Sequence, residues 1–298
     1  MISICLATYN GSQYIKEQIA SVLPQLAPDD EMIISDDGST DDTLALVLSF
    51  SDDRIIVEKG PCRGSAPLNF ENALRYAKGD YIFFCDQDDV WLPEKIAAGV
   101  KALKRIEADG IPSLYFCNTN LVDAEGHFIQ KGLNDTLKLT KGNSLIESFG
   151  AGCTMCFNKP LHHLLLSHLT EGKVYHDRWA YLTAMFLGRV VYDPTAYINY
   201  RQHGNNTVGT KTENEKGKSV NRLFAPHPFS ISETAQTLLD YYGNLIDERD
   251  KKLIKTCSHY KTTIASRMKL AFANDFKLAY GGFSRRVFWS LRLLLGKL

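Results

Sequence analysis

Three carboxylates, Asp86, Asp88 and Asp89, follow directly on an apolar run in YIFFCDQDD, residues 81–89. At the end of a buried strand, carboxylates this close repel one another unless something positive binds them. Mg²⁺ and Mn²⁺ prefer oxygen ligands, and Mg²⁺ commonly uses one or two protein carboxylates while phosphate oxygens and water complete its octahedron. Asp86 and Asp88 are two residues apart, so on an extended segment they point to the same side. The segment predicts a divalent-cation site, with helix capping or a solvated turn as the alternative.

A second acidic segment, SDDGSTDD at residues 35–42, also follows an apolar run. Asp37 could accept hydrogen bonds from a base N–H or a ribose hydroxyl, which would orient a nucleotide without a metal. The residues that follow, Gly38 to Asp41, equally suit a turn and the cap of the next helix. Both interpretations can hold together, with Asp37 binding the ligand and Thr40 or Asp41 capping the helix.

A third cluster, Thr8, Tyr9 and Asn10, ends the first apolar run of the chain. It combines an aromatic face that could stack on a ring with two polar side chains. No G-x-G-x-x-G pattern follows this run, so the fingerprint of a dinucleotide-binding fold is missing. The cluster therefore favours a nucleotide contact of another kind over a dehydrogenase.

Short apolar runs alternate with amphipathic stretches of helix length through the first half of the chain. Strands are expected at residues 2–8, 31–35, 55–58, 81–85 and 114–117, and helices at 14–26, 41–50, 69–78 and 93–108. This alternation predicts an α/β fold, a Rossmann-like parallel sheet with helices on its faces. Ligands of such sheets bind beyond the carboxyl ends of the strands. We therefore expect the three polar clusters to lie at one edge.

The second half has a mixed pattern. A hairpin is expected around residues 123–126, strands at 152–157 and 189–192, a helix at 178–187 and a mobile loop at 211–218, followed by helices. The seven cysteines show no framework spacing, and Cys153 and Cys156 form a lone CxxC. Without a second pair of ligands, buried thiols are favoured over a zinc or redox role, which suits a reducing cytosol.

The net charge of zero conceals a division along the chain. Residues 249–298 carry 12 basic and 2 acidic side chains, whereas residues 1–248 carry 22 basic and 32 acidic ones. The segment 284–298 places its apolar residues on one side of a helix and Arg285, Arg286, Arg292 and Lys297 on the other. It is too short to span a bilayer but suits a helix lying on an anionic membrane. Packing against the body or a partner subunit is the alternative.

The sequence gives no sign of a spanning helix or a signal peptide, because no long uncharged apolar run is present and the N-terminus lacks a basic start. The overall charge balance gives no reason to expect a nucleic-acid partner. We expect a cytoplasmic protein, peripheral on the inner face of the cell membrane.

Several of these motifs together resemble the family 2 glycosyltransferases, whose Rossmann-like fold is called GT-A. ATYNG, SDDGSTDDT and CDQDDVWLPEK occur in the family's order and at its spacing. HDRW, residues 176–179, resembles the segment that carries the family's general base, and YRQHGNN, residues 200–206, is similar to a motif of its bacterial rhamnosyltransferase-like branch. The resemblance covers residues 1–210.

The resemblance implies a role for each matching residue. Thr8, Tyr9 and Asn10 would form the first-strand nucleotide contact, Asp37 would bind the nucleobase, Asp86 the ribose or the metal, and Asp88 the metal at the donor diphosphate. Asp177 would be the catalytic base, with N-capping of its helix as the alternative. His203 is a candidate third metal ligand. Leu68 stands where relatives often have a basic residue, and Arg63 could substitute for it.

The resemblance also implies a mixed, mainly parallel GT-A sheet at residues 1–210, with a nucleotide-sugar half at 1–110, an acceptor half at 111–210 and a helical extension at 211–298. The expected reaction is inverting and uses Mg²⁺ or Mn²⁺. The donor would be dTDP-rhamnose or, second, a UDP-hexose, and the acceptor a lipid-linked saccharide of bacterial surface polysaccharide. A sugar nucleotidyltransferase is the rival enzyme, although its Gly-rich triphosphate loop is missing. A non-catalytic scaffold is the other alternative.

Overall fold

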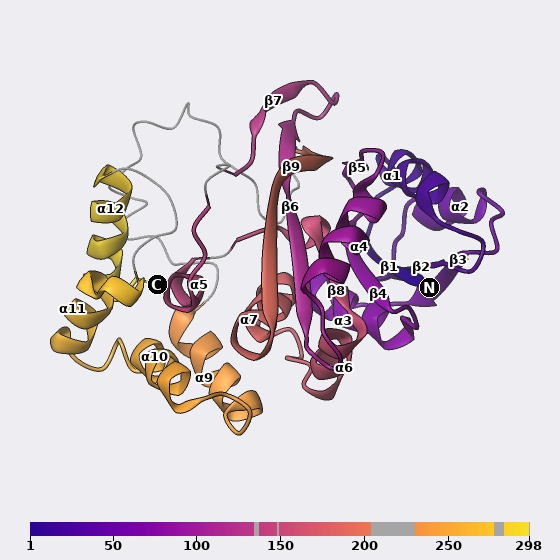
Figure 1. The fold of residues 1–298 in the computed structure, drawn as a ribbon. Helices are drawn as coiled ribbons and strands as arrows, with labels where there is room; N and C mark the ends of the chain where they lie inside the picture. Colours follow the sequence, from indigo (N-terminus) through magenta and orange to yellow (C-terminus); the bar gives the residue numbers. More distant parts are fainter. Residues whose placement is uncertain (134–136, 148, 204–229, 277–282, 298) are drawn as a thin grey trace. The chain divides into compact units, whose positions relative to one another are not determined.

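The computed structural model describes residues 1–133, 137–147, 149–203, 230–276 and 283–297 (Figure 1). The chain forms two compact units. The first unit comprises Met1–Asn134, Gly150–Ala184 and Gly188–Asn206, and the second comprises Asp135–Phe149, Met185–Leu187 and Thr207–Leu298. The expected boundary at residues 210–211 and the expected loop at 211–218 lie outside the described residues.

The first unit is built around one mixed sheet. Its strands are β1 (Ile2–Thr8), β2 (Glu31–Asp36), β3 (Ile55–Lys59), β4 (Tyr81–Asp86), β5 (Val90–Trp91), β6 (Ser113–Val122), β7 (Phe128–Lys131), β8 (Met155–Asn158) and β9 (Arg189–Arg201). They lie in the order β3-β2-β1-β4-β8-β6-β9-β5, and β7 pairs with β6.

Strand direction decides which ends meet. β3, β2, β1 and β4 are parallel to one another, β8 runs antiparallel between β4 and β6, and β9 is parallel to β6. β4, β6 and β9 therefore end at the same edge as β1 and β2, and β8 begins there. The expected GT-A-like architecture, a mixed sheet with a parallel first half and flanking helices, is confirmed.

Helices cover both faces of this sheet because its central strands bury side chains on both sides. The helices are α1 (Ile15–Val22), α2 (Thr43–Leu48), α3 (Ala66–Tyr76), α4 (Lys95–Ile106), α6 (Lys159–Ser167) and α7 (His176–Leu187) (Figure 1). Ile4 and Leu6 of β1 point into a core shared with α1 and α4, whereas the intervening Cys5 is buried on the opposite face.

Local chemistry explains where the elements depart from expectation. The first helix changes after Val22 into a 3₁₀ turn, Leu23–Gln25, because Pro24 has no N–H to continue the ladder. The strand expected at residues 152–157 begins as a 3₁₀ turn, Gly152–Thr154, before β8. The strand expected at residues 189–192 continues to Arg201, because β9 follows β6 through register shifts that accommodate Pro194.

The second unit is helical. It contains α5 (Lys141–Ile146), α9 (Ile231–Tyr242), α10 (Glu248–Ser258), α11 (Ile264–Phe272), the 3₁₀ turn Asn274–Phe276 and α12 (Phe283–Leu294). Ser230, Asp247 and Thr263 each accept a backbone N–H at the start of a helix, and these N-caps fix where α9, α10 and α11 begin. Among the described helices, none has the length and apolar character needed to cross a membrane.

One side chain of the expected basic face lies inside this unit. Arg292 of α12 is buried, and its guanidinium donates a 2.8 Å hydrogen bond to the carbonyl of Lys297. It also lies over the Phe288 ring. Arg292 is therefore buried although it belongs to the expected basic side of segment 284–298, because its long side chain reaches a carbonyl just beyond the end of the helix.

Candidate active site

The polar clusters found in the sequence share one edge of the sheet. In the strand register, Ala7 pairs with Asp86, Thr8 with Asp36, and Val122 with Arg201. The segments that follow these residues therefore emerge side by side, as the carboxyl ends of parallel strands do. All the side chains described below belong to the first unit.

Gln87 joins the ends of β1 and β4. Its Oε1 accepts hydrogen bonds from the Thr8 hydroxyl at 2.6 Å and from the Tyr9 N–H at 2.9 Å, while its Nε2 donates to the Tyr9 carbonyl at 3.2 Å. The Thr8 side chain is thus buried and engaged, whereas Tyr9 is 49% exposed. Of these two residues, Tyr9 has the ring surface that a base could stack on.

Asn10 connects two loops of the same edge. It adopts a left-handed conformation with φ 47°, which Asn tolerates better than most residues. Its side-chain oxygen accepts the Thr40 N–H at 2.8 Å, and its own N–H donates to the Ser39 hydroxyl at 2.9 Å. The side chain therefore holds the loop after β2 against the loop after β1.

Asp36 and Asp37 have different hydrogen-bond partners, which bears on whether this segment forms a turn or binds a ligand. Asp36 accepts the N–H groups of Gly38 and Ser39, so the turn chemistry falls on this residue. Asp37 is buried, and its two oxygens accept the N–H groups of Arg63 and Ser65, both at 3.2 Å. Asp37 therefore fixes the loop after β3, and the Arg63 side chain is exposed from that loop.

Asn69 of α3 connects the ends of β1 and β2 through hydrogen bonds, a role that the sequence did not indicate. Its side-chain nitrogen donates to the carbonyls of Thr8 and Ser35, and its oxygen accepts the Ser35 hydroxyl at 2.6 Å. The residue is buried beneath the nucleotide-site candidates. A buried amide with all its bonds made fixes the relative position of β1 and β2. No sequence signal distinguishes this Asn from any other helical Asn.

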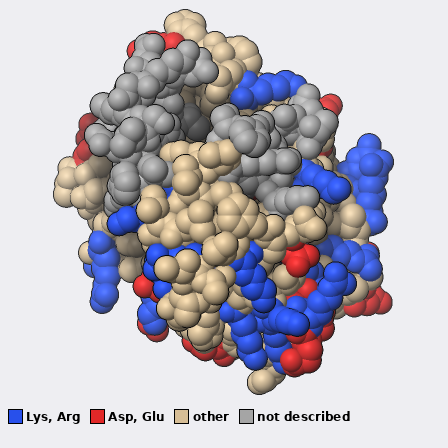
Figure 2. Space-filling view, turned by 90° about the vertical axis from the view of Figure 1, so that its left-hand side faces the viewer, with Lys and Arg blue, Asp and Glu red and all other residues tan. Residues whose placement is uncertain are grey.

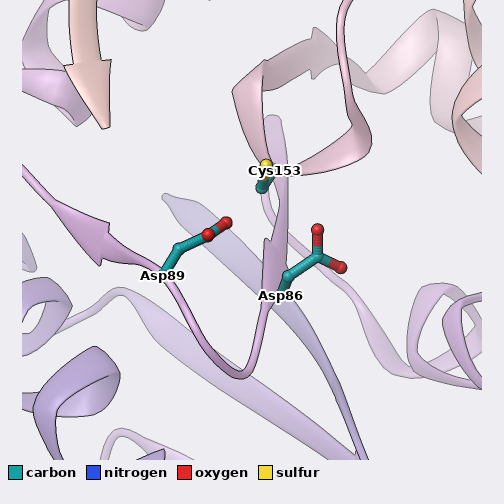
Figure 3. A group of neighbouring side chains, drawn as sticks. All are labelled: Asp86, Asp89 and Cys153. Atoms are coloured by element: carbon teal, nitrogen blue, oxygen red, sulfur yellow. The ribbon is translucent and has the colours of Figure 1, made fainter. Parts of the chain in front are cut away.

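Asp86, Asp89 and Cys153 form the acidic centre of the edge. One ligand atom of each lies within 4.8 Å of the others. The two aspartates flank the turn between β4 and β5, and Cys153 comes from the 3₁₀ turn before β8 (Figure 3). Asp89 Oδ2 is buried without a nitrogen or oxygen donor among the described residues. Asp89 belongs to the acidic segment of the sequence but was not among the expected metal ligands, and Cys153 was expected only as a buried thiol.

Crowding changes how these groups titrate. Burial, followed by the charges of Asp88 and Asp177, raises the pKa of Asp86 to about 7. Burial and the charges of Asp88 and Asp86 raise the pKa of Asp89 well above its usual range. Burial and the two neighbouring aspartates raise the pKa of the Cys153 thiol in the same way, so the thiol is neutral. The centre holds more negative charge than its surroundings stabilise, which favours a cation.

Asp88 has a different partner. His203, just beyond β9, places its Nε2 2.8 Å from Asp88 Oδ2, and its ring stacks on Tyr14 with 5.0 Å between the centroids. The two expected metal ligands are thus brought together, although 115 residues separate them in sequence. The carboxylate accepts, so the imidazole donates this hydrogen bond in the absence of a cation.

Arg201 binds the turn between β4 and β5, which carries Asp88 and Asp89. Its backbone N–H donates to Asp89 Oδ1 at 3.0 Å, and its side-chain Nε donates to the Asp88 carbonyl at 2.9 Å. Its outer nitrogens bind the Ala124 carbonyl and the Glu17 carboxylate. One buried guanidinium thereby fixes the turn that carries the aspartates. In the sequence, Arg201 stands out only as a neighbour of His203 in YRQHGNN. Its contacts with the turn at Asp88 and Asp89 are seen only in the structure.

Asp177 lies in the first turn of α7, and its charge acts on Asp86. One of its oxygens accepts the N–H of Arg178 at 2.6 Å within this turn, but the N-cap of α7 is Tyr175, so N-capping, the expected alternative role of Asp177, is wrong. Trp179, two residues on, is buried and donates its indole N–H to the His168 carbonyl. It is therefore a core anchor at the start of α7.

His176 packs as an aromatic ring beside Asp177. It stacks on Phe70 with 3.8 Å between the centroids and meets Phe84 edge-on. Neither of its buried ring nitrogens has a hydrogen-bond partner among the described residues. Burial lowers the pKa of His176 to about 4, although the charge of Asp177 acts in the opposite direction.

This burial predicts an acid-sensitive fold. The unfolded chain protonates this histidine near its ordinary pKa of 6.5, whereas the folded chain does so only near 4. The contribution of the buried, neutral His176 to the free energy of unfolding is therefore fully present above pH 6.5. This contribution, roughly 3 kcal/mol, is lost as the pH falls from 6.5 to 4. His176→Leu should flatten this part of the stability curve in urea unfolding measured at several pH values. An unchanged slope would show that His176 is hydrated in solution.

Comparison with known proteins decides the family. Residues 3–164 match the family model described as Glycosyl transferase family 2, which is more than half of the chain. The chain belongs to glycosyl transferase family 2. It is therefore a glycosyltransferase, as its motifs implied.

Relatives of this glycosyltransferase extend beyond the matched segment. It is 28% identical over 314 residues to an uncharacterized glycosyltransferase of Rickettsia typhi, covering 98% of this chain and 91% of the relative. It is 31% identical to the dTDP-rhamnosyl transferase RfbG of Shigella flexneri over 219 residues, 68% of this chain and 73% of that protein. It is also 32% identical over 155 residues to WfgD of Escherichia coli, a UDP-Glc:alpha-D-GlcNAc-diphosphoundecaprenol beta-1,3-glucosyltransferase, covering 51% of this chain and 58% of that one.

The fold of the glycosyltransferase is also found among solved structures. Staphylococcus aureus TarS 1–349 in complex with UDP-GlcNAc superimposes with a TM-score of 0.62 at 16% identity, covering 97% of this chain and 78% of that one. At this identity the likeness establishes the fold, which agrees with the GT-A sheet described above.

Proposed function

We propose that this glycosyltransferase transfers a sugar from a nucleoside diphosphate donor to an acceptor hydroxyl, with inversion, in the synthesis of bacterial surface polysaccharide. The observation that carries the proposal is the meeting of Asp86, Asp88 and Asp177 at one edge of the sheet, where the charges of Asp88 and Asp177 both act on Asp86. We take residues 1–210 as the catalytic part and residues 211–298 as its helical extension.

The acidic centre fits a divalent cation with a preference for oxygen. Asp86, Asp88 and Asp89 offer carboxylate oxygens, and the neutral Cys153 thiol is a poor ligand for Mg²⁺ or Mn²⁺. We propose Asp86 and Asp88 as protein ligands, with His203 turning from Asp88 to the metal or to the donor diphosphate. A cation held there would neutralise the departing nucleoside diphosphate.

The nucleotide is proposed to lie beside this centre, along the loops after β1, β2 and β3. Tyr9 offers an exposed ring, and Asp37 lies at the junction of these loops with acceptor capacity beyond the two N–H groups that it already binds. Thr8 and Asn10 support the site by holding its loops. Arg63 extends from the third loop and is proposed to contact the base or the diphosphate in place of the missing basic residue at Leu68.

Asp177 is proposed as the base that accepts the proton of the attacking hydroxyl. A base on the face of the sugar opposite the departing diphosphate gives single displacement, hence inversion at the anomeric carbon. Its place at the start of α7, where its charge acts on Asp86, supports this role, because an acceptor hydroxyl bound there would lie beside the donor.

The relatives guide the choice of donor and acceptor. RfbG is named a dTDP-rhamnosyl transferase and matches more than two thirds of this chain, so dTDP-rhamnose is the first donor to test. WfgD is named for UDP-Glc and a diphosphoundecaprenol-linked acceptor, so UDP-hexoses come second. A lipid-linked saccharide is the proposed acceptor, with the protein held at the cytoplasmic face of the membrane through residues 284–298.

Nucleotide binding tests this proposal. In a thermal shift assay with dTDP, UDP and GDP, each with and without Mn²⁺ or Mg²⁺, one nucleotide should raise Tm by about 5 °C, only with the cation and at a concentration near 100 times Kd. Asp88→Asn should remove the response. No response to any nucleotide would indicate a scaffold, whereas a response only to nucleoside triphosphates would favour a nucleotidyltransferase. A panel of nucleotide sugars offered with a lipid-linked acceptor would then identify the donor.

A further inference from the structure

Two helices of the second unit expose apolar stripes that the core does not use. On α11, Ile264, Met268 and Phe272 are 73%, 51% and 65% exposed. On α12, Val287 and Leu291 are exposed, and so is Leu295 just beyond the helix. Both sets repeat every four residues, so each forms a continuous stripe along its helix. Scattered apolar residues are normal on a surface, but two aligned stripes mark an interaction site.

The pairing of the two helices brings these stripes together. Ser290 donates to the Ala271 carbonyl and Arg267 donates to the Leu294 carbonyl, so α11 and α12 pass each other in opposite directions. In each helix the stripe lies roughly 80° around the axis from the residues that make these contacts, in the same sense of rotation. For antiparallel helices, this offset turns both stripes to the same face of the pair.

A basic cavity adjoins the stripe on α11. It has a volume of about 470 Å³ and is lined by residues of α10 and α11 and the turn between them: Glu248, Lys251, Lys252, Lys255, Thr256, His259, Ser266 and Lys269. The Glu248 carboxylate pairs with Lys251 at 2.6 Å, which leaves the other lysines in excess. Lys269 follows Met268 directly, so the cavity and the stripe meet along α11. Figure 2 shows uncharged side chains bordered by Lys and Arg on this side of the molecule.

We propose that this face of α10, α11 and α12 docks on an anionic phospholipid bilayer. The apolar stripes would enter the boundary between headgroups and acyl chains, and the cavity would receive the phosphate of a lipid headgroup. The proposal rests on the proposed lipid-linked acceptor and extends the membrane contact from residues 284–298 to α10 and α11. An apolar strip edged by lysines is the pattern of helices that lie in the membrane interface.

The charge pattern favours lipid over a second copy of the chain. In a two-fold pairing through this face, the basic cavity of one copy would approach that of the other, and like charges would oppose association. An anionic bilayer instead attracts each lysine near its surface. The same lysines should make binding weaken as salt rises.

Co-sedimentation of the full-length protein with vesicles tests the proposal. The vesicles would be phosphatidylcholine alone or phosphatidylcholine with about one third phosphatidylglycerol. We expect binding to the anionic vesicles only, reduced about tenfold or more by Lys252→Glu/Lys255→Glu. The control variant, Lys101→Glu/Lys104→Glu, reverses an equally spaced exposed pair on α4 of the first unit and should bind as the wild type does. Ile264→Ser/Met268→Ser/Phe272→Ser should also lose binding.

The outcomes separate this inference from the proposed function. Equal binding by the α10 and α4 variants, or no binding by the wild type, would overturn the docking face. Light scattering that shows a dimer lost in the stripe variant would assign the face to a second copy, and would overturn it as well. The cation-dependent response to nucleotides should persist in every one of these variants, because none of the substituted residues belongs to the acidic centre. Its loss in the wild type would contradict the proposed function alone.

Discussion

Asp177→Asn should fold and bind the donor yet lose about 10³-fold in the rate of sugar transfer. Asn has nearly the same shape and can still orient a hydroxyl, but it cannot accept its proton. The contact to the Arg178 N–H uses a side-chain oxygen that Asn retains, so the first turn of α7 should survive. Initial rates with donor in excess, together with nucleotide affinity by calorimetry, measure the two properties separately.

Glu233→Gln provides a matched control, because it is also a change of carboxylate to amide in the first turn of a helix, α9. It should leave transfer unchanged. If Asp177→Asn retains transfer within a few-fold of the wild type, Asp177 is not the base, which must then be sought elsewhere. If nucleotide affinity falls together with the rate, the residue positions the donor.

Asp86→Asn should stabilise the protein in the presence of a chelator while abolishing its response to the cation. The pKa of Asp86 is raised from 3.8 to about 7, so the folded chain resists ionising a group that the unfolded chain ionises readily. The resulting loss of stability begins as pH rises above about 4 and is complete above about 7. At pH 8 the variant should gain on the order of 3 kcal/mol in unfolding free energy.

Urea unfolding at pH 5 and pH 8, with chelator and with Mn²⁺ plus nucleotide, measures both effects. The gain should shrink toward pH 5, where Asp86 of the wild type is already protonated in the fold. Asp109→Asn, at an exposed position of the first unit, should change neither quantity. A variant that is destabilised in chelator would show that other groups already neutralise Asp86.

Many of the polar residues at the carboxyl edge of the sheet could be predicted, because a geometric rule places them there. Parallel strands end together, so polar residues after Thr8, Asp36 and Asp86 had to meet once the alternation of strands and helices was recognised. The motifs then supplied the family, which the match over residues 3–164 confirmed. Asp88 and His203, both expected as ligands of one metal, lie within hydrogen-bond distance of each other, and their role as ligands stays a prediction.

Contacts that depend on packing could not be predicted. Cys153 reaches Asp86 and Asp89 only because β8 is inserted antiparallel beside β4, and nothing in a lone CxxC indicates this. Gln87 and Asn69 are ordinary polar residues whose importance comes from the buried carbonyls and hydroxyls they meet. The burial of Arg292 could not be predicted either, because a helical wheel ignores the carbonyl of Lys297 beyond the helix end.

The contacts of Arg201 have a consequence for protein engineering. Its backbone and guanidinium fix the turn at Asp88 and Asp89, and His203, two residues later, pairs with Asp88. The turn after β4 and the end of β9 thus function as one part, although more than a hundred residues separate them. A chimaera that joins the donor half of one relative to the acceptor half of another would divide this part between two parents. Exchanging the β4–β5 turn together with the end of β9 should keep it intact.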